Sequence, residues 1–278
     1  MLALSNFFER RTVAANLLLA GAAFSLPVIT GAAGDAALSL LITLPAIVAL
    51  AVLWGVVADR IGAVRERERE RSCQRATIDA LSTALTASDR YTGTHAQQTL
   101  WYVRDVCEEL VDSVKVREYV ADVAVLHDIG KIGIPDEILH APGKLDERQW
   151  KVMKQHPVIG ERIVATVPGL QEVARAIRHE HEHWDGGGYP DGLRQDEIPL
   201  ASRIVLVCDA LHAMTSDRSY RAAMTLEQAR MELASNAGTQ FDPTVVGALL
   251  QVLDRRPLDQ MPPVAVFNDS GELVVGEA

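Results

Sequence analysis

The sequence lacks a surplus of basic residues. Its 27 lysines and arginines are outnumbered by 37 aspartates and glutamates, which leaves a formal net charge of −10 over 278 residues. Because a protein that binds DNA or RNA polymers needs a basic surface to face the phosphates, this charge argues against nucleic-acid binding. An anionic ligand would have to be held by local cations, either metal ions or a few placed lysines and arginines.

Cysteine is also scarce. The chain has three cysteines, Cys73, Cys107 and Cys208, and they are not clustered. This number and spacing indicate neither a disulfide framework nor a cysteine-based zinc site. We therefore expect reduced cysteines in a cytoplasmic domain.

Charge is absent from two long stretches near the N-terminus. Thr12–Gly34 and Ala36–Ala58 contain no charged residue, and only Asp35 separates them. Each stretch is long enough to cross a bilayer core of about 30 Å as a helix. We expect residues 1–59 to form a membrane anchor, with transmembrane helices at about 12–32 and 36–58 and the lipid bilayer as a partner.

Arginines lie at the outer ends of the two stretches, and none lies between them. Arg10 and Arg11 precede the first stretch, and Arg60 and Arg65 follow the second. The positive-inside rule therefore places both ends in the cytoplasm, as a multi-pass hairpin with the rest of the chain in the cytoplasm. The alternative is a cleaved signal peptide, which we disfavour because a second span of equal length follows at once.

Residues 60–87 are expected to form a helical linker. Arg65–Arg71 reads RERERER, in which opposite charges at i,i+3 and like charges at i,i+4 nearly cancel. Ile78, Leu81 and Leu85 fit an a/d seam, although that register meets polar residues upstream. Two interpretations stay open: a solvated connector, or a helix that forms a homodimer and relays a signal from the membrane.

Alternating β-strand patterns are absent from Ser88 until the tail. Apolar residues recur at helical spacing, and glycine and proline mark the breaks, for example at Pro168-Gly169. We expect an all-α domain over residues 88–256, followed by a tail, 257–278, in which Val264–Val275 resembles a small β-hairpin. The expected helices cover His95–Leu110, Val116–Leu126, Glu147–Met153, Ile159–Ile177, Arg203–Met214 and Leu226–Leu233.

Imidazole and carboxylate side chains occur at five separate places in this domain. Such a mixture suits a hard or borderline divalent cation with hydrolytic work to do, and each place lies near a helix end or a Gly/Pro break. Neighbours on a helix point about 100° apart, but at a helix end before Gly130 both members of a His-Asp pair can converge on one ion. The five places are His95, His127-Asp128, His156, the cluster His179–Asp185 and Asp209.

Ordered sequence blocks between about Ser88 and Val246 resemble the HD-GYP family of phosphodiesterases, a branch of the HD metal-dependent phosphohydrolases. The blocks are DRYTGTH (Asp89–His95), LHDIGKIGIP (Leu126–Pro135), MKQHPVIG (Met153–Gly160), HEHWDGGGYPDGL (His181–Leu193), IPLASRI (Ile198–Ile204), CDALHAMTSDRSYR (Cys208–Arg221) and FDP (Phe241–Pro243).

The resemblance implies an HD-domain helical bundle that hydrolyses cyclic di-GMP, a bacterial second messenger, to pGpG, and in a second cut to GMP. Together with the predicted membrane anchor, this places the protein at the bacterial inner membrane. The resemblance also implies two divalent metal ions, Fe or Mn, with Asp128 bridging them, and protein signalling partners. Asp128 and Lys131 would be catalytic, and Lys131, Arg218 and Arg221 would contact phosphate. The implied metal ligands are His95, His127, Asp128, His156, Glu180, His181 and Asp209.

The chain departs from the family pattern at Glu180, where the family usually has a histidine. A carboxylate there keeps an anionic ligand and favours a harder ion. Glu182 is expected to orient a ligand from behind it, and His179 and His183 are expected to flank the site. Asp185 is expected to cap the turn into the three glycines.

Two further departures concern the neighbourhood of the metals. Tyr91 stands where some members carry a glutamate that supports a third metal, which favours a two-metal site. His212 stands where many members have an aspartate, which removes a nearby acidic contact.

Three alternative functions remain. His179–His183 also fits the H-E-x-x-H and H-x-x-E-H signatures of zinc proteases, although that motif needs a continuing helix and Gly186–Gly188 interrupt it. Glu180 keeps open a catalytically degenerate receptor that binds a cyclic dinucleotide or a partner protein. The versatility of HD domains keeps open the hydrolysis of another phosphoester.

Overall fold

The structure is a computed structural model of the chain, and it describes residues 33–88, 90–216, 222–256, 265–267 and 273–275. The chain divides into two compact units, residues 1–72 and 73–278, which are treated separately below. The predicted first transmembrane helix, at about 12–32, lies outside the described residues.

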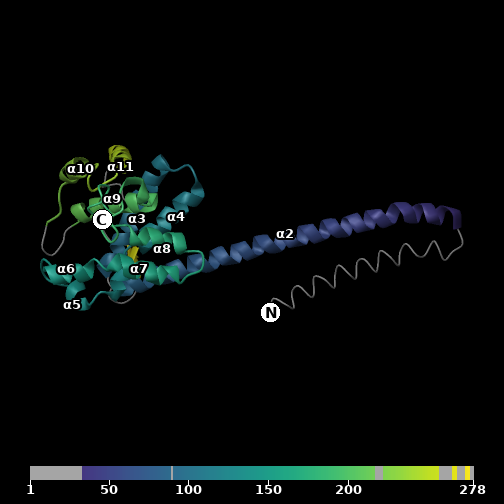
Figure 1. Cartoon of the computed structure of the whole chain (residues 1–278), viewed down its shortest axis with the longest axis horizontal. Helices are drawn as coiled ribbons and strands as arrows, with labels where there is room; N and C mark the ends of the chain where they lie inside the picture. The colour runs from purple at the N-terminus through teal and green to yellow at the C-terminus, as the bar shows by residue number, and fades with distance from the viewer. Residues whose placement is uncertain (1–32, 89, 217–221, 257–264, 268–272, 276–278) are drawn as a thin grey trace. The chain divides into compact units, whose positions relative to one another are not determined.

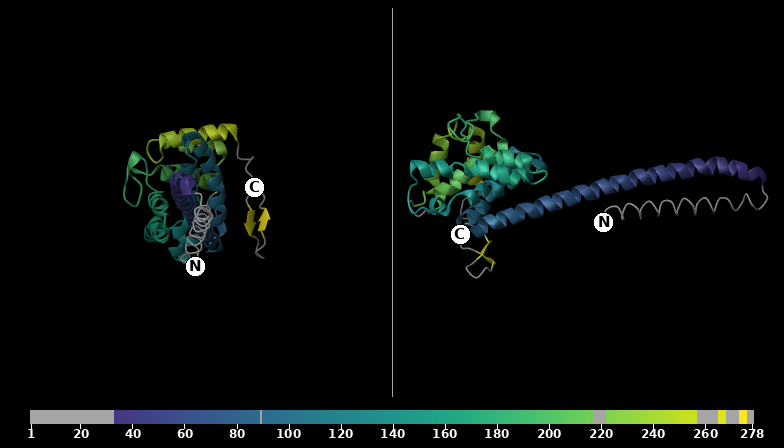
Figure 2. Two further views of the ribbon diagram at one scale, coloured as in Figure 1. Left: turned by 90° about the vertical axis from the view of Figure 1, so that its right-hand side faces the viewer. Right: turned by 60° about the horizontal axis from the view of Figure 1, so that its bottom comes forward.

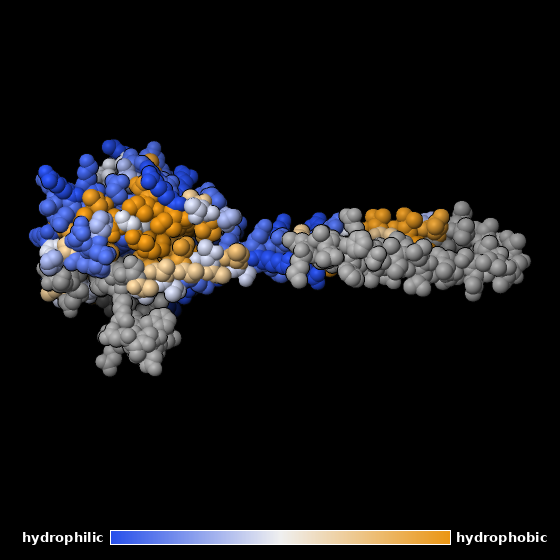
Figure 3. Space-filling model, turned by 90° about the horizontal axis from the view of Figure 1, so that it is seen from below, coloured by the Kyte–Doolittle hydropathy of each residue, from blue (hydrophilic) through white to orange (hydrophobic). Residues whose placement is uncertain are grey.

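The described part of the first unit belongs to one helix, α2 (Ala33–Ser88), which runs on into the second unit. From Leu44 onward α2 is long and apolar enough to cross a membrane, and its most apolar stretch is not buried inside the protein. Leu50 and Trp54 are 66% and 60% exposed. Figure 3 shows this apolar stretch in orange and the charged stretch of the same helix in blue. An exposed apolar surface of this kind fits a membrane-embedded segment.

The C-terminal end of α2 is part of the second unit. Ile78 and Leu85 are buried in its hydrophobic core, and Leu81 packs against that core. Gln74 donates a hydrogen bond to the backbone oxygen of Pro168, 3.1 Å away. The apolar residues of the predicted a/d seam therefore pack into the hydrophobic core of the second unit of the same chain.

The second unit is a bundle of helices, which confirms the predicted all-α class (Figure 1). In the labels, η marks a 3-10 helix. After α2, the elements of the second unit are α3 (Arg90–Leu110), α4 (Val114–Leu126), η1 (Ile129–Gly133), α5 (Asp136–Leu139), α6 (Glu147–Met153), α7 (His156–Ala165), α8 (Gln171–Arg178), η2 (Gln195–Glu197), α9 (Leu200–Thr215), α10 (Leu226–Ser235), α11 (Pro243–Arg255), β1 (Ala265–Phe267) and β2 (Leu273–Val275).

Helix α9 is the centre of the bundle. It packs against α3, α4, α8, α10 and α11. Ile204, Val205 and Leu211 are fully buried on it. Burying one such side chain contributes about 1.5–3 kcal/mol. The central helix therefore gives Asp209 a rigid support.

Two elements differ from the predicted helices. The stretch Ile159–Ile177 is two helices, α7 and α8, because Pro168 has no backbone N–H and Gly169 adopts a φ of 83°. Helix α11 was not among the predicted helices. Asp242 caps it by accepting a hydrogen bond from the Thr244 N–H at 2.8 Å, and Pro243 occupies its first turn.

The predicted hairpin in the tail is confirmed. Strands β1 and β2 pair antiparallel, with Val266 opposite Val274, and Figure 2 shows them side by side in yellow. The residues that connect the two strands, 268–272, lie outside the described residues.

Candidate metal centre

His127 and Asp128 lie in the turn between α4 and η1. Both side chains are buried, with 1% and 3% of their surface exposed. His127 Nε2 lies 3.3 Å from Asp128 Oδ2. The break between the two helices lets these chain neighbours face the same space, which a continuous helix would prevent.

Gly130 brings this turn against the start of α7. A Cβ atom on Gly130 would collide with the backbone oxygen of His156 and would lie 2.5 Å from the backbone nitrogen of Gly160. Only glycine allows so close an approach. The contact sets Asp128 beside His156, with 3.7 Å between Asp128 Oδ1 and His156 Nε2.

Backbone carbonyls orient two of the imidazoles. His127 Nδ1 lies 2.7 Å from the oxygen of Ala124, and His156 Nδ1 lies 2.8 Å from the oxygen of Met153. Because a carbonyl oxygen only accepts, each Nδ1 carries the proton and donates it. Nε2 is then the nitrogen of each ring that can offer its lone pair to a metal, as is usual for histidine ligands.

His156, Glu180 and His181 form one compact group, whose nearest ligand atoms all lie within 4.8 Å of one another. His181 Nε2 lies 3.1 Å from His156 Nε2 and 2.8 Å from Glu180 Oε2. Within the described residues neither oxygen of Glu180 accepts a hydrogen bond of good geometry. Burial opposes the charge of His181, but the nearby Glu180 raises the pKa of this imidazole. The Glu180 side chain is nevertheless fully buried. A buried carboxylate without donors is costly unless a cation neutralises it.

Asp128 lies between this group and a second group, which contains His127 and Asp209. Its Oδ1 faces His156, whereas its Oδ2 faces His127 and lies 2.7 Å from Lys131 Nζ. Asp209, on α9, places Oδ1 3.8 Å from His127 Nε2. A carboxylate that bridges two cations needs this placement of its two oxygens.

The carboxylates dominate the electrostatics of the site. Burial lowers the pKa of His127, but Asp128, Glu180 and Asp209 outweigh it and raise that pKa to about 10. Burial also opposes the charge of Lys131, yet Asp128 raises the pKa of this ammonium above its usual value. The pKa of His156 falls to about 3, because burial and the neighbouring His181 disfavour its charged form. Positive charge is therefore favoured where the carboxylates meet.

The donor set fits divalent cations. Among the described residues, imidazole nitrogens and carboxylate oxygens converge, and a buried carboxylate lacks a hydrogen-bond donor. The predicted ligands that the structure brings together are His127, Asp128, His156, Glu180, His181 and Asp209. The side chain of His95, on α3, and residues Arg218 and Arg221 lie outside the described residues, so their roles stay predictions.

The glycine-rich loop after the ligands is fastened to the segment that carries them. Glu182 Oε1 accepts hydrogen bonds from the backbone N–H groups of Asp191 at 2.7 Å and Gly192 at 3.0 Å. A Cβ atom on Gly188 would collide with the backbone of His183. Glu182 therefore holds this loop, whereas the sequence predicts that it orients a metal ligand.

The two flanking histidines do not form a helical metal motif. Helix α8 ends at Arg178, and His179 Nε2 lies 3.0 Å from Asp191 Oδ2. The zinc-protease alternative needs His179 and His183 on one face of a continuing helix, so the structure excludes it. Asp185 Oδ1 accepts a hydrogen bond from the Gly187 N–H at 2.8 Å, which confirms the predicted cap.

Two further side chains belong to the site, although we assigned them no role from the sequence. The ring of Tyr189 stacks on His181, with 5.0 Å between ring centroids and 18° between ring planes. Arg203 donates to Asp242 at 2.8 Å, and its guanidinium lies 5.6 Å from the centre of the Trp184 ring. Both residues occur in the sequence blocks quoted above, which was the available signal.

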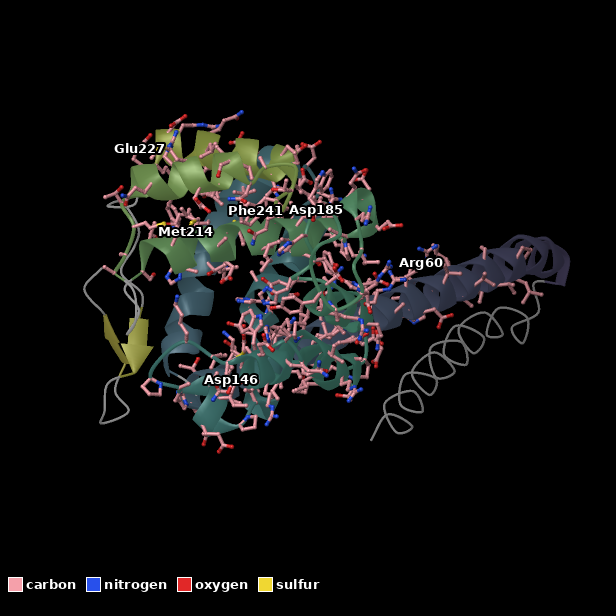
Figure 4. All side chains as sticks on the ribbon, turned by 60° about the vertical axis from the view of Figure 1, so that its left-hand side comes forward. Arg60, Asp146, Asp185, Met214, Glu227 and Phe241 are labelled. Atoms are coloured by element: carbon pink, nitrogen blue, oxygen red, sulfur yellow. The ribbon has the colours of Figure 1, made fainter. Side chains whose placement is uncertain are left out.

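The loop is also tied to the segment before α11. The backbone N–H of Trp184 donates to the oxygen of Gln240 at 3.1 Å, and that of Asp185 donates to the oxygen of Thr239 at 2.8 Å. Figure 4 shows the labelled Asp185 and Phe241 next to each other. The residues just before the glycine run are therefore held by the Arg203 contact with Trp184 and by these two backbone hydrogen bonds.

Comparison with known proteins gives a consistent result. The HD domain family profile matches residues 79–245. The chain is 42% identical over 166 residues to a cyclic di-GMP phosphodiesterase of Thermotoga maritima, covering 59% of this chain and 45% of the relative. It is 38% identical over 200 residues to the cyclic di-GMP phosphodiesterase response regulator RpfG of Xanthomonas campestris, covering 71% and 51%.

A third relative is named for a related compound, 3'3'-cGAMP. The 3'3'-cGAMP-specific phosphodiesterase 2 of Vibrio cholerae is 38% identical over 190 residues, covering 66% of this chain and 36% of the relative. The chain thus spans about half or less of the length of these relatives. In fold, it is similar to the HDG"Y"P protein Bd1817 of Bdellovibrio bacteriovorus, with a TM-score of 0.50 at 16% identity over 67% of this chain and 64% of that one.

Proposed function

Because the chain belongs to the HD domain family, we propose that it is a metal-dependent phosphodiesterase that hydrolyses cyclic di-GMP to pGpG and, in a second cut, to GMP. One observation carries the proposal. Glu180 is buried without a hydrogen-bond donor beside two imidazoles, and Asp128 lies between this group and His127. Bound cations would neutralise the buried carboxylates of this cluster and so offset the cost of burying them. The names of the relatives support the substrate class.

Two divalent cations, Fe or Mn, would supply Lewis acidity and a water of lowered pKa when bound. The side chains proposed to hold them are His95, His127, Asp128, His156, Glu180, His181 and Asp209. The carboxylates among these ligands favour a hard or borderline ion over a soft one.

The chain's own cations would bind the anionic substrate. The raised pKa of Lys131 keeps this side chain protonated at neutral pH, and Asp128 holds its ammonium at the edge of the ligand groups. There it can donate hydrogen bonds to a phosphate oxygen and offset charge that develops during cleavage. Arg218 and Arg221 are proposed to add further phosphate contacts.

We propose the bacterial inner membrane as the location of the protein. The apolar stretch of α2 supports one span, and the uncharged stretch at residues 12–32 would form the other. In this topology both ends lie in the cytoplasm, where homodimerisation and signalling partners could act on the domain. A reporter fused after Ala278 should give a cytoplasmic signal, and a periplasmic signal would contradict the hairpin.

Two other functions have an observation in their favour. Glu180 stands where the family usually has histidine, which favours a receptor that binds the dinucleotide without cleaving it. The Vibrio relative is named for 3'3'-cGAMP, which favours a related cyclic dinucleotide as substrate.

The test uses the full chain, purified in detergent and loaded anaerobically with Fe(II) or Mn(II). We expect cyclic di-GMP to disappear and pGpG to accumulate in chromatograms of the reaction. A parallel assay with 3'3'-cGAMP measures the preference between the two dinucleotides. If the protein holds a stoichiometric amount of either metal and binds cyclic di-GMP tightly without turnover, the result would contradict the enzyme and favour the receptor function.

A further inference from the structure

Tyr189 lines the proposed metal centre. Its ring stacks on the imidazole of His181, and its backbone N–H donates to the oxygen of His181 at 3.1 Å. Burial raises the pKa of the Tyr189 hydroxyl, and Glu180, Asp128 and Asp209 raise it further. Tyr189 is therefore in direct contact with His181, a predicted metal ligand.

Lys154 is a second neighbour of the Tyr189 ring. It follows α6 and lies two residues before His156 in the chain. Its half-buried side chain places Nζ 5.7 Å from the centre of the Tyr189 ring. Within the described part of the chain, no carboxylate is ion-paired with Lys154, whereas Lys131 lies 2.7 Å from Asp128.

A cation held in this way keeps its charge for a ligand. A lysine side chain is flexible, and the face of a tyrosine ring can hold its ammonium near one place without neutralising it. A carboxylate partner would cancel the charge instead. The ligand groups beside Tyr189 are rich in carboxylates, so an anionic substrate needs compensating cations around them.

We propose that Lys154 binds the phosphodiester of the substrate that is not being cleaved. This inference rests on the proposed function, because a cyclic dinucleotide carries two phosphodiesters. One of them would lie at the metal ligands beside Lys131, whereas the ammonium of Lys154 lies 5.7 Å from the centre of the Tyr189 ring, which stacks on His181. Lys154 is thus a substrate-binding residue for cyclic dinucleotides, and it has no contact with a substrate that carries a single phosphate.

The number of phosphates in the substrate provides the test. Lys154→Met in the metal-loaded full-length protein should raise KM for cyclic di-GMP about 10-fold, the effect expected for one charge-assisted contact, and leave kcat within about 2-fold. Hydrolysis of bis(p-nitrophenyl) phosphate, which has one phosphodiester, should remain within about 2-fold of the wild type. Lys154→Arg should restore most of the affinity because it keeps the charge.

Lys151→Met is the matched control, because Lys151 is an exposed lysine three residues before Lys154, inside α6. It should change neither substrate's kinetics. If Lys154 only positioned Tyr189 and His181, then Lys154→Met would slow both substrates equally, and that result would overturn the inference.

An unchanged KM for cyclic di-GMP in Lys154→Met would overturn the inference and leave the proposed function intact. Wild-type protein that cleaves bis(p-nitrophenyl) phosphate but neither binds nor cleaves cyclic di-GMP would overturn the proposed substrate, and the role of Lys154 with it. The two failures are therefore distinguishable.

Discussion

The two ligand groups of the proposed metal centre differ in how their negative charge is compensated. In the group around His127, Asp128 is paired with Lys131 at 2.7 Å. In the group of His156, Glu180 and His181, no lysine or arginine among the described residues is ion-paired with the buried Glu180, whose Oε2 lies 2.8 Å from His181 Nε2. The first group can hold its charge with the chain's own residues, whereas the second is left with a costly buried carboxylate. The second group therefore depends more strongly on a bound cation.

The two groups also differ in their supports. The first is held by helix ends and by the tight contact of Gly130 with α7. The second includes two residues that follow α8 in irregular chain, and Glu182 fastens the loop beyond them. The predictions below test these differences, beginning with the residue that both groups share.

Asp128→Ala should affect both groups together. We expect turnover to fall at least about 100-fold. Substitution of residues that only hydrogen-bond to a metal ligand costs about 10- to 100-fold, and the loss of a ligand should cost more. Metal content, measured by atomic emission, should fall as well. Asp112→Ala, at an exposed position, is the control. Retained metal and activity in the Asp128 variant would contradict its place between the groups.

Gly130→Ala should push the two groups apart. The added methyl group would collide with the backbone of His156, and overpacking of this kind costs about 1–3 kcal/mol of unfolding free energy. Urea unfolding measures the loss, and metal affinity should fall with it. Gly143→Ala is a matched control, because nothing lies within 4 Å of a Cβ atom there. Equal stability of the two variants would contradict the close approach.

Glu180→Gln should have opposite effects with and without metal. In metal-free protein, removal of the buried charge should raise the free energy of unfolding by about 1–2 kcal/mol. With Mn(II) present, the variant should gain less stability than the wild type, because it has lost an anionic ligand. Thermal unfolding with and without the metal measures both effects. A metal-free variant that is less stable than wild type would show that Glu180 is already compensated.

Asp191→Asn should give the smallest effect. Hydrogen bonds from Arg178, with His179 also contributing, hold the pKa of Asp191 at about 2. A depressed carboxyl pKa stabilises the fold above the ordinary value near 4, and this stabilisation disappears as the pH falls towards 2. Because the side chain is 35% exposed, we expect less than about 1 kcal/mol at pH 7.

Denaturation of wild type and Asp191→Asn between pH 2 and pH 7 measures this contribution. The difference between them should shrink as the pH falls. A constant difference over this range would mean that Asp191 acts through packing alone. In either case the metal content of the variant at pH 7 reports whether the loop supports the second group.

Much of the helical fold could be predicted because α9 and its neighbours follow an apolar pattern with clear breaks. The bounds of α6 coincide with the predicted Glu147–Met153. The division of Ile159–Ile177 depended on a turn whose proline and glycine were visible in the sequence. Helix α11 was missed because its cap, Asp242, was noted only as part of a motif.

The candidate site shows the limit more clearly. The ligand types at His127, Asp128 and His156 could be predicted, since their motifs are local. The role of Gly130 could not, because it depends on the backbone of a helix that begins 26 residues later in the sequence. The stacking of Tyr189 on His181 likewise depends on how the loop folds back, and spacing along the chain does not encode that.

The burial of Ile78 and Leu85 has a practical consequence for dissecting the protein. A soluble fragment cut after Ser88 would leave two holes in the hydrophobic core, each costing about 2–5 kcal/mol if the gap resembles a large-to-alanine change. Such a fragment should aggregate on expression, whereas one that starts at Arg60 should elute as a folded species in gel filtration. The start of the folded domain is thus encoded inside a helix whose earlier residues are suited to lipid.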